Sequence, residues 1–154
     1  GDYDFVQDVI KDKLKAEVLF HGVNLKPGMH ILLALKDNKI IVALPGFAYS
    51  STVCAMLYVL PLIYKFRNSN EKLPLVKARI NQDFSRFQAK TIFTACNVEY
   101  KNGEYQINFD GKKSGTSAIL TNMLESPALL IQKENSKNIK AGDLVDILLL
   151  NNLK

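Results

Sequence analysis

The sequence has few residues of the kinds that hold metals or form disulfides. Cys54 and Cys96 are its two cysteines in 154 residues, far apart and each within an apolar segment. There is no Cys-x-x-Cys pair, and the two histidines, His21 and His30, form no cluster. A disulfide framework and a zinc site are therefore not indicated. We expect two buried free thiols and a reducing, cytoplasmic location.

Long apolar runs and segregated charge are also missing. The longest apolar run, residues 53–64, is too short to span a bilayer, and the first residues lack a signal-peptide pattern, so we expect no membrane association. The net charge is only +5 and the lysines are scattered along the chain, so we expect no nucleic-acid partner. The same charge suits a pocket for a small anionic ligand.

The first part of the chain alternates apolar strands with helices. Residues 4–14 show helical spacing, with Asp2 or Asp4 available as N-cap, and residues 51–66 form a nearly all-apolar helix in which Pro61 should kink or re-phase the last turn. Strands are expected at residues 16–23, 31–35 and 40–44, the last two joined by a tight turn at 36–39. Near-continuous apolar strands with helices favour a parallel or mixed sheet covered by helices.

The polar segment 67–72 marks a predicted boundary, which divides the chain into an α/β part, residues 1–67, and an all-β part, residues 71–154. Beyond it, short apolar runs and turn residues predict a small antiparallel barrel or sandwich. The expected strands are residues 75–84, 91–100, 105–109, 129–131 and 144–150, with a hairpin turn at 101–104 and one or two helical turns at 117–124.

Two Pro-Gly loops are the strongest candidates for a ligand site. Each follows an apolar run, and both should emerge near one edge of the sheet, which would bring together Asn24, Lys26, Ser50 and Ser51. Ser50 or Ser51 could also cap the helix that follows. Lysine and serine side chains suit a phosphate-like anion.

Five motifs in order carry a family resemblance: GDYD at residues 1–4, FHGVNLKPG at 20–28, LPGFAYS at 44–50, the apolar helix with a proline near its end, and AGDLVDILLL at 141–150. Together they resemble molybdopterin molybdenumtransferase, the bacterial relative of the gephyrin E domain. The resemblance implies the C-terminal half of a molybdopterin-binding α/β domain, residues 1–67, followed by a C-terminal β-barrel domain, residues 71–154. It also implies a C-terminal fragment of a longer protein, inactive alone.

The family inserts molybdenum from molybdate into adenylylated molybdopterin, with a divalent cation such as Mg²⁺, and works as a homodimer. By resemblance, Asp4 is the acidic residue that would hold Mg²⁺ and take part in catalysis. By the same resemblance Lys26 would be a catalytic and ligand-binding lysine, and Ser50 and Ser117 would bind the ligand. Ser51 is a ligand-binding candidate because it lies beside Ser50 in the second loop.

Several positions depart from the family pattern. Met29 stands where the family has a second lysine, Phe47 and Ala48 replace an Asn-Pro pair, and Ala95 falls where a barrel arginine is expected. With half of the anion clamp missing, we expect Met29→Lys to tighten oxyanion binding. The departures also favour an alternative, a module that binds molybdopterin or another anion, or scaffolds a partner, without catalysis. A basic anion- or RNA-binding domain is a third hypothesis.

Simpler roles exist for each candidate residue. Asp4, Ser50 and Ser51 are common helix-cap types, and a lysine before Pro-Gly is usually a solvated loop residue. His21 is read as a hydrogen-bonded strand residue, and no catalytic triad stands out. The sequence alone does not separate a transferase from a binding module.

Overall fold

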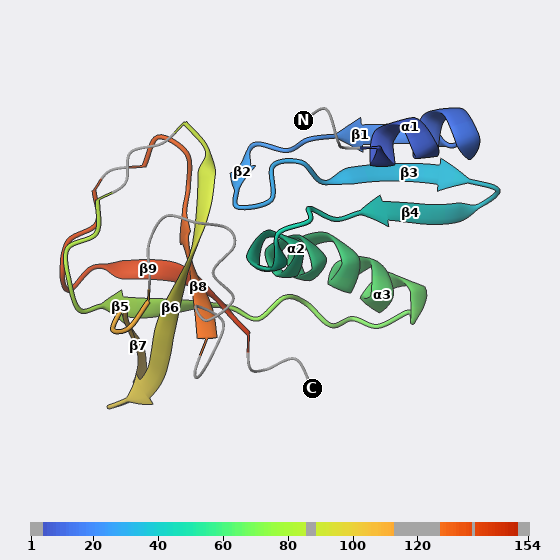
Figure 1. The fold of residues 1–154 in the computed structure, drawn as a ribbon. Helices are drawn as coiled ribbons and strands as arrows, with labels where there is room; N and C mark the ends of the chain where they lie inside the picture. Colours follow the sequence, from blue (N-terminus) through green and yellow to red (C-terminus); the bar gives the residue numbers. More distant parts are fainter. Residues whose placement is uncertain (1–4, 86–88, 113–126, 137, 151–154) are drawn as a thin grey trace.

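The computed structural model describes residues 5–85, 89–112, 127–136 and 138–150, which form a three-stranded sheet with helices beside a β-barrel (Figure 1). The helical segments, with η marking π-helix, are α1 (Val6–Asp8), η1 (Val9–Lys13), α2 (Ala48–Cys54), η2 (Ala55–Val59) and α3 (Leu60–Phe66). The strands are β1 (Glu17–His21), β2 (Leu25–Lys26), β3 (Leu32–Lys36), β4 (Lys39–Ala43), β5 (Leu75–Ile80), β6 (Thr91–Lys101), β7 (Glu104–Asn108), β8 (Pro127–Gln132) and β9 (Leu144–Leu149).

The first sheet has the order β1-β3-β4, and both pairs are antiparallel. The expectation of a parallel or mixed sheet is wrong for these strands. The reason lies in the turn between β3 and β4, where Asp37 and Asn38 both take positive φ, 48° and 61°. This two-residue turn folds the chain straight back, which only an antiparallel pair allows.

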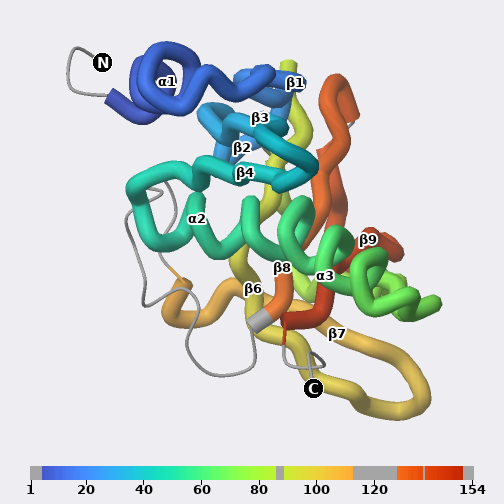
Figure 2. Tube along the Cα trace, turned by 90° about the vertical axis from the view of Figure 1, so that its right-hand side faces the viewer, coloured from blue at the N-terminus to red at the C-terminus, as the bar shows by residue number. Residues whose placement is uncertain are grey.

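Helical segments cover the two faces of this sheet (Figure 2). On one face, Ile10 of η1 packs with Ala16, Leu32 and Ala34. On the other, the ring of Phe20 lies 6.1 Å from that of Tyr58 in η2. A register shift between Val18 and Phe20 turns β1 locally. Residues two apart in a regular strand share a face, but here the half-buried Val18 packs against the Ile10 cluster and the half-buried Phe20 lies against Tyr58 on the other face.

The long helix runs from α2 through η2 to α3 without interruption. It begins at Ala48 with Phe47 as N-cap and no side-chain cap, so the expectation that Ser50 or Ser51 caps it is wrong. Both serines lie inside its first turns. α1 likewise has Phe5 as N-cap rather than Asp2 or Asp4, which lie outside the described residues.

The re-phasing expected at Pro61 is confirmed. The π-helical segment η2 precedes Pro61, and the N–H of Leu60 bonds to the carbonyl of Ala55, five residues back. Proline has no N–H to donate, and its ring collides with the carbonyl four residues before it in a regular helix. A wider turn just ahead of the proline accommodates both effects.

The second sheet closes into a small barrel. Its order is β2-β6-β7-β5-β9-β8, and the additional β6–β8 pairing closes five strands, with β2 attached outside the ring. The barrel is confirmed, but β5 and β7 pair in parallel, contrary to the fully antiparallel expectation. The turn at 101–104 is confirmed by positive φ at Asn102 and Gly103. Residues 117–124 lie outside the described part of the chain.

Hydrophobic clusters fill the barrel and cover its outer wall. Inside, Cys96, Ile107, Leu130 and Ile147 belong to a buried cluster. Outside, a second cluster joins Tyr49, Val53 and Met56 of the long helix to Phe93, Ala95, Leu129 and Leu148 of the barrel. The division into residues 1–67 and 71–154 stays a prediction, and the structure adds that the two parts share this second cluster.

The helix Ala48–Phe66 is long and apolar enough, by length and composition, to cross a membrane. A core helix of a soluble protein passes the same test, so this property alone does not indicate a membrane. Here Tyr49, Val53 and Met56 face the barrel, and the hydroxyl of Tyr49 donates to the carbonyl of Phe93 at 2.9 Å.

Candidate functional site

The loop between β1 and β3, residues 22–31, folds back on itself and carries Lys26. The N–H of Gly22 donates to the carbonyl of Ile31 at 2.8 Å, and the N–H of Val23 donates to the carbonyl of Met29 at 2.9 Å. Between these bonds, β2 pairs in parallel with the start of β6, with Lys26 opposite Ile92. The loop is therefore fixed at both the sheet and the barrel, and the Lys26 side chain is exposed.

Gly28 seats this loop directly on the long helix. Its φ is +111°, and its carbonyl accepts a hydrogen bond from Sγ of Cys54 at 3.4 Å. A Cβ at this position would lie 2.3 Å from that sulfur and 3.6 Å from the carbonyl of Ser50. Only glycine permits this close approach, which brings the Lys26 loop against the turn that holds Ser50 and Ser51.

The two serines differ in accessibility. Ser50 is only 4% exposed, since it lies one helical turn before Cys54 on the face covered by Gly28. Ser51 is half-buried. The sequence expectation that the two loops meet is thus met in the backbone, with Lys26 on the surface and Ser50 beneath the loop.

Asn24 departs from the expected arrangement, because its side chain faces the barrel. Its Nδ2 donates to the carbonyl of Ala89 at 3.1 Å and to Oε2 of Glu134 at 2.7 Å. Its own carbonyl accepts from the N–H of Thr91 at 3.2 Å. Asn24 therefore fastens the loop to the barrel.

Lys90 is a neighbour of this loop that no sequence pattern predicted. It immediately precedes β6, and its Nζ lies 2.7 Å from Sδ of Met29. The Lys90 side chain is half-buried, whereas Met29 is exposed. The two residues are 61 positions apart in the chain, so no local sequence pattern could predict their contact.

Two predicted site residues lie outside the described part of the chain, Asp4 and Ser117. Among the residues that the structure does describe, no group of three or more His, Cys, Asp or Glu side chains could hold a metal ion. The described donors therefore do not make a magnesium site by themselves.

The departures from the family pattern fall in different environments. Ala95 is 3% exposed and belongs to the cluster between barrel and helix, where an arginine would be buried among apolar side chains. Phe47 is 60% exposed at the start of the long helix.

Both cysteines are buried and free, as expected. Burial raises the pKa of Cys54 to about 11 and that of Cys96 to about 12. Both are therefore neutral thiols near pH 7, and the Cys54 sulfur supports the loop as a donor to Gly28 rather than as a nucleophile.

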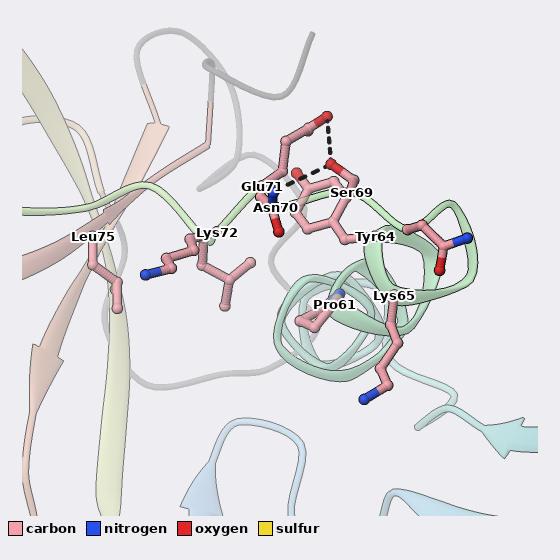
Figure 3. Close-up of a pocket in the computed structure, with 10 residues that line it drawn as sticks. Pro61, Tyr64, Lys65, Ser69, Asn70, Glu71, Lys72 and Leu75 are labelled. Carbon is pink, nitrogen blue, oxygen red and sulfur yellow. Dashed lines mark hydrogen bonds between the residues drawn. The ribbon is translucent and has the colours of Figure 1, made fainter.

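A separate open cavity of about 880 Å³ lies where the long helix leads into β5. Figure 3 shows Tyr64 and Lys65 on the helix side and Lys72 and Leu75 toward the barrel. Ser69 donates to Oε1 of Glu71 at 3.1 Å on its rim. Of the predicted site residues that the structure describes, none lines this cavity.

No protein-family profile matches the chain. A molybdopterin molybdenumtransferase of Staphylococcus aureus strain Mu50 is 27% identical over 151 residues, covering 97% of this chain and 35% of that protein. The protein of the same name from Bacillus subtilis strain 168 is 26% identical over 151 residues, covering 97% of this chain and 34% of its own length.

The chain is a relative of the molybdopterin molybdenumtransferases. A solved molybdopterin biosynthesis moeA protein from Pyrococcus horikoshii OT3 has the same fold, with a TM-score of 0.66 and 24% identity over 96% of this chain and 38% of that one. The chain spans about a third of the length of the curated molybdenumtransferases that it matches. The fold expected from the resemblance, part of an α/β domain followed by a small barrel, is confirmed.

Proposed function

We propose that the protein is a molybdopterin molybdenumtransferase, inserting molybdenum from molybdate into adenylylated molybdopterin during molybdenum cofactor biosynthesis. The observation that carries the proposal is the seating of Gly28 on the long helix, which brings the loop of Lys26 to the turn of Ser50 and Ser51. Lys26 is exposed, and no carboxylate lies within 4.0 Å of its Nζ among the described residues. An unpaired lysine beside serines suits a tetrahedral oxyanion.

In this proposal Lys26 binds and orients the oxyanion, and Ser51 donates a hydrogen bond to it. Ser50 reaches the ligand only if the loop lifts from the helix, because it now lies beneath Gly28. Ser117 adds a donor from the barrel part. Asp4 contributes one carboxylate toward Mg²⁺, and the further ligands would come from outside the described residues, so we derive no step through the metal.

The oxyanion step is testable by calorimetric titration of molybdate into the purified chain. Lys26→Ala should remove a charge-assisted contact and weaken binding by about one to two factors of ten. Lys39→Ala, a matched change at the far end of the β3–β4 hairpin, should leave the affinity unchanged. Equal effects of both substitutions would show that this loop is not the binding site.

Catalysis needs a second experiment, because the chain spans only part of its relatives. The chain would be joined to the preceding region of the Bacillus subtilis relative and assayed for molybdate-dependent formation of the cofactor. Turnover that depends on Lys26 supports the transferase. Molybdate or molybdopterin binding without turnover supports the alternative, a non-catalytic binding or scaffolding module. The uncharged residues Met29 and Ala95, at positions where the family has a lysine and an arginine, favour this alternative.

We further propose that the protein works as a homodimer in the cytoplasm. The support for self-association is the apolar surface near the start of the chain, where Phe5, Val9 and Leu14 are exposed. Sedimentation velocity across a concentration series tests it, with a constant monomer mass as the contrary result.

A further inference from the structure

The ammonium group of Lys90 contacts the Lys26 loop at Met29, where the Val23–Met29 hydrogen bond closes it. Its Nζ contacts Sδ of Met29 at 2.7 Å, and Met29 lies three residues after Lys26 on the same turn. The contact joins the start of the barrel strand β6 to the loop that carries Lys26.

The backbone on both sides of Lys90 is fixed. The carbonyl of Ala89 accepts from Nδ2 of Asn24, and the N–H of Thr91 donates to the carbonyl of Asn24. Thr91 also stands opposite Leu25 in the β2–β6 pairing. One residue of the loop, Asn24, therefore fixes the backbone on both sides of Lys90 and so sets the point from which its side chain extends.

The charge of Lys90 is not neutralised by its partner. A thioether sulfur is a weak, uncharged acceptor, and an ammonium group has three protons to donate. No carboxylate lies within 4.0 Å of the Nζ of Lys90 or of Lys26 among the described residues. The acidic group that contacts this loop, Glu134, accepts from the amide of Asn24.

We propose that Lys90 is the second cation of the oxyanion site, supplied by the barrel to a loop that carries only one. This inference rests on the proposed function of the Lys26 loop. The ligand it implies is a doubly charged tetrahedral oxyanion, either molybdate or the phosphate monoester of a pterin. An anion bound beside this loop would contact Lys26 and Lys90 together and displace the ammonium of Lys90 from the sulfur of Met29.

This arrangement changes the expectation for Met29→Lys. A lysine at position 29 would place its ammonium against that of Lys90, and like charges in contact repel each other. The single substitution should therefore lower the stability of the unliganded protein. Exchanging the two residues, Met29→Lys with Lys90→Met, keeps one ammonium and one thioether at the contact and avoids the repulsion.

The test is calorimetric titration of molybdate, and in a second series inorganic phosphate, into the full chain at two salt concentrations. Lys90→Met should weaken binding about tenfold and make the affinity less dependent on salt, and Lys90→Arg should retain most of it. The double exchange should recover affinity to within about threefold of wild type. Circular dichroism melting of each variant checks that it is folded.

The outcomes separate the two proposals. If Lys26→Ala weakens binding while Lys90→Met and the double exchange both leave it unchanged, the role of Lys90 is overturned and the proposed oxyanion loop stands. If the wild-type chain binds neither anion, both are overturned. A Lys90 effect on phosphate but not on molybdate supports Lys90 as a ligand of a phosphate group, and the reverse supports it as a ligand of the metal oxyanion.

Discussion

The barrel and the three-stranded sheet solve the problem of exposed strand edges in different ways. The β6–β8 pairing closes the barrel and leaves its apolar cluster enclosed, with Ile80, Leu130 and Ile147 all 0% exposed. The sheet ends at β1 and β4, and Leu19 of β1 is 50% exposed. The barrel can therefore hold its own fold, whereas the sheet depends on what packs beside it. The candidate site lies between them: the Lys26 loop follows the sheet strand β1, and Lys90 directly precedes the barrel strand β6.

The largest expected effect is the loss of a barrel core side chain. Ile147→Ala should lower the free energy of unfolding by about 3 kcal/mol, because Ile147 is fully enclosed. Leu32→Ala, at 2% exposure in the smaller cluster of the sheet, should cost about half as much because its surroundings can relax. Urea unfolding of both variants measures the difference, and equal costs would contradict the comparison.

The contact between loop and helix gives the next largest effect. Gly28→Ala should cost about 2 kcal/mol, because alanine at φ +111° is strained and its Cβ meets Cys54. The double variant Gly28→Ala/Cys54→Ala should recover only part of this loss, since the strain at φ remains. Gly46→Ala is the matched control, because a Cβ there meets nothing within 4 Å, and a loss as large as that of Gly28→Ala would disprove the role of close packing.

Native-state hydrogen exchange compares the two regions without substitution. Amides of β1 and β3 should exchange at least about tenfold faster than those of β8 and β9, because an open sheet with uncovered edges opens locally at lower cost. Added molybdate should reduce the difference in exchange rate between the two regions if the site joins both, since a ligand stabilises the state that binds it. Equal protection throughout would show that sheet and barrel unfold as one unit.

The smallest expected effect is a pH dependence on the barrel surface. Lys140 lies 2.8 Å from Asp83, and with the N–H of Ala141 it lowers the pKa of that carboxyl. Because the folded-state pKa is depressed, this stabilisation is present above the ordinary value near 3.8 and is lost as the pH falls through the lower folded value. Asp83→Asn should therefore flatten the acid side of the stability profile slightly. Asp37→Asn in the sheet is the control. If it flattens the acid side of the stability profile as much as Asp83→Asn does, the contact of Asp83 with Lys140 is not the cause.

Local sequence patterns predicted most helices and strands. The features that they did not predict depend on contacts between residues far apart in the chain. The two hairpins follow from turn residues that accept positive φ, Asp37-Asn38 and Asn102-Gly103. The strand β2 has two residues and no period of its own, so only its pairing with β6 defines it. The helix starts earlier than predicted, with Tyr49 anchored to Phe93, a contact 44 residues away.

The candidate site shows the same division. The sequence predicted that the Lys26 loop and the serine turn would meet, because each Pro-Gly loop follows an apolar run and both should emerge near one edge of the sheet. Ser50 is buried because Gly28, held by Cys54, covers its helix face, and Lys90 is positioned because Asn24 binds Ala89 and Thr91 on either side of it. Both contacts join segments far apart in the chain, so local sequence patterns do not predict them.

The π-helical turn η2 amounts to one extra residue spliced into a long α-helix. Each residue of an α-helix advances by about 100°, so the insertion rotates everything after it by that angle relative to the residues before it. Tyr58, inside this turn, contacts Phe20 of the sheet and also packs against the barrel-side cluster that contains Met56. The extra residue therefore sets the angle at which α3 follows α2. Deleting a single residue between 55 and 59 would rotate α3 by about 100° relative to α2 without altering any side chain of the Lys26 loop.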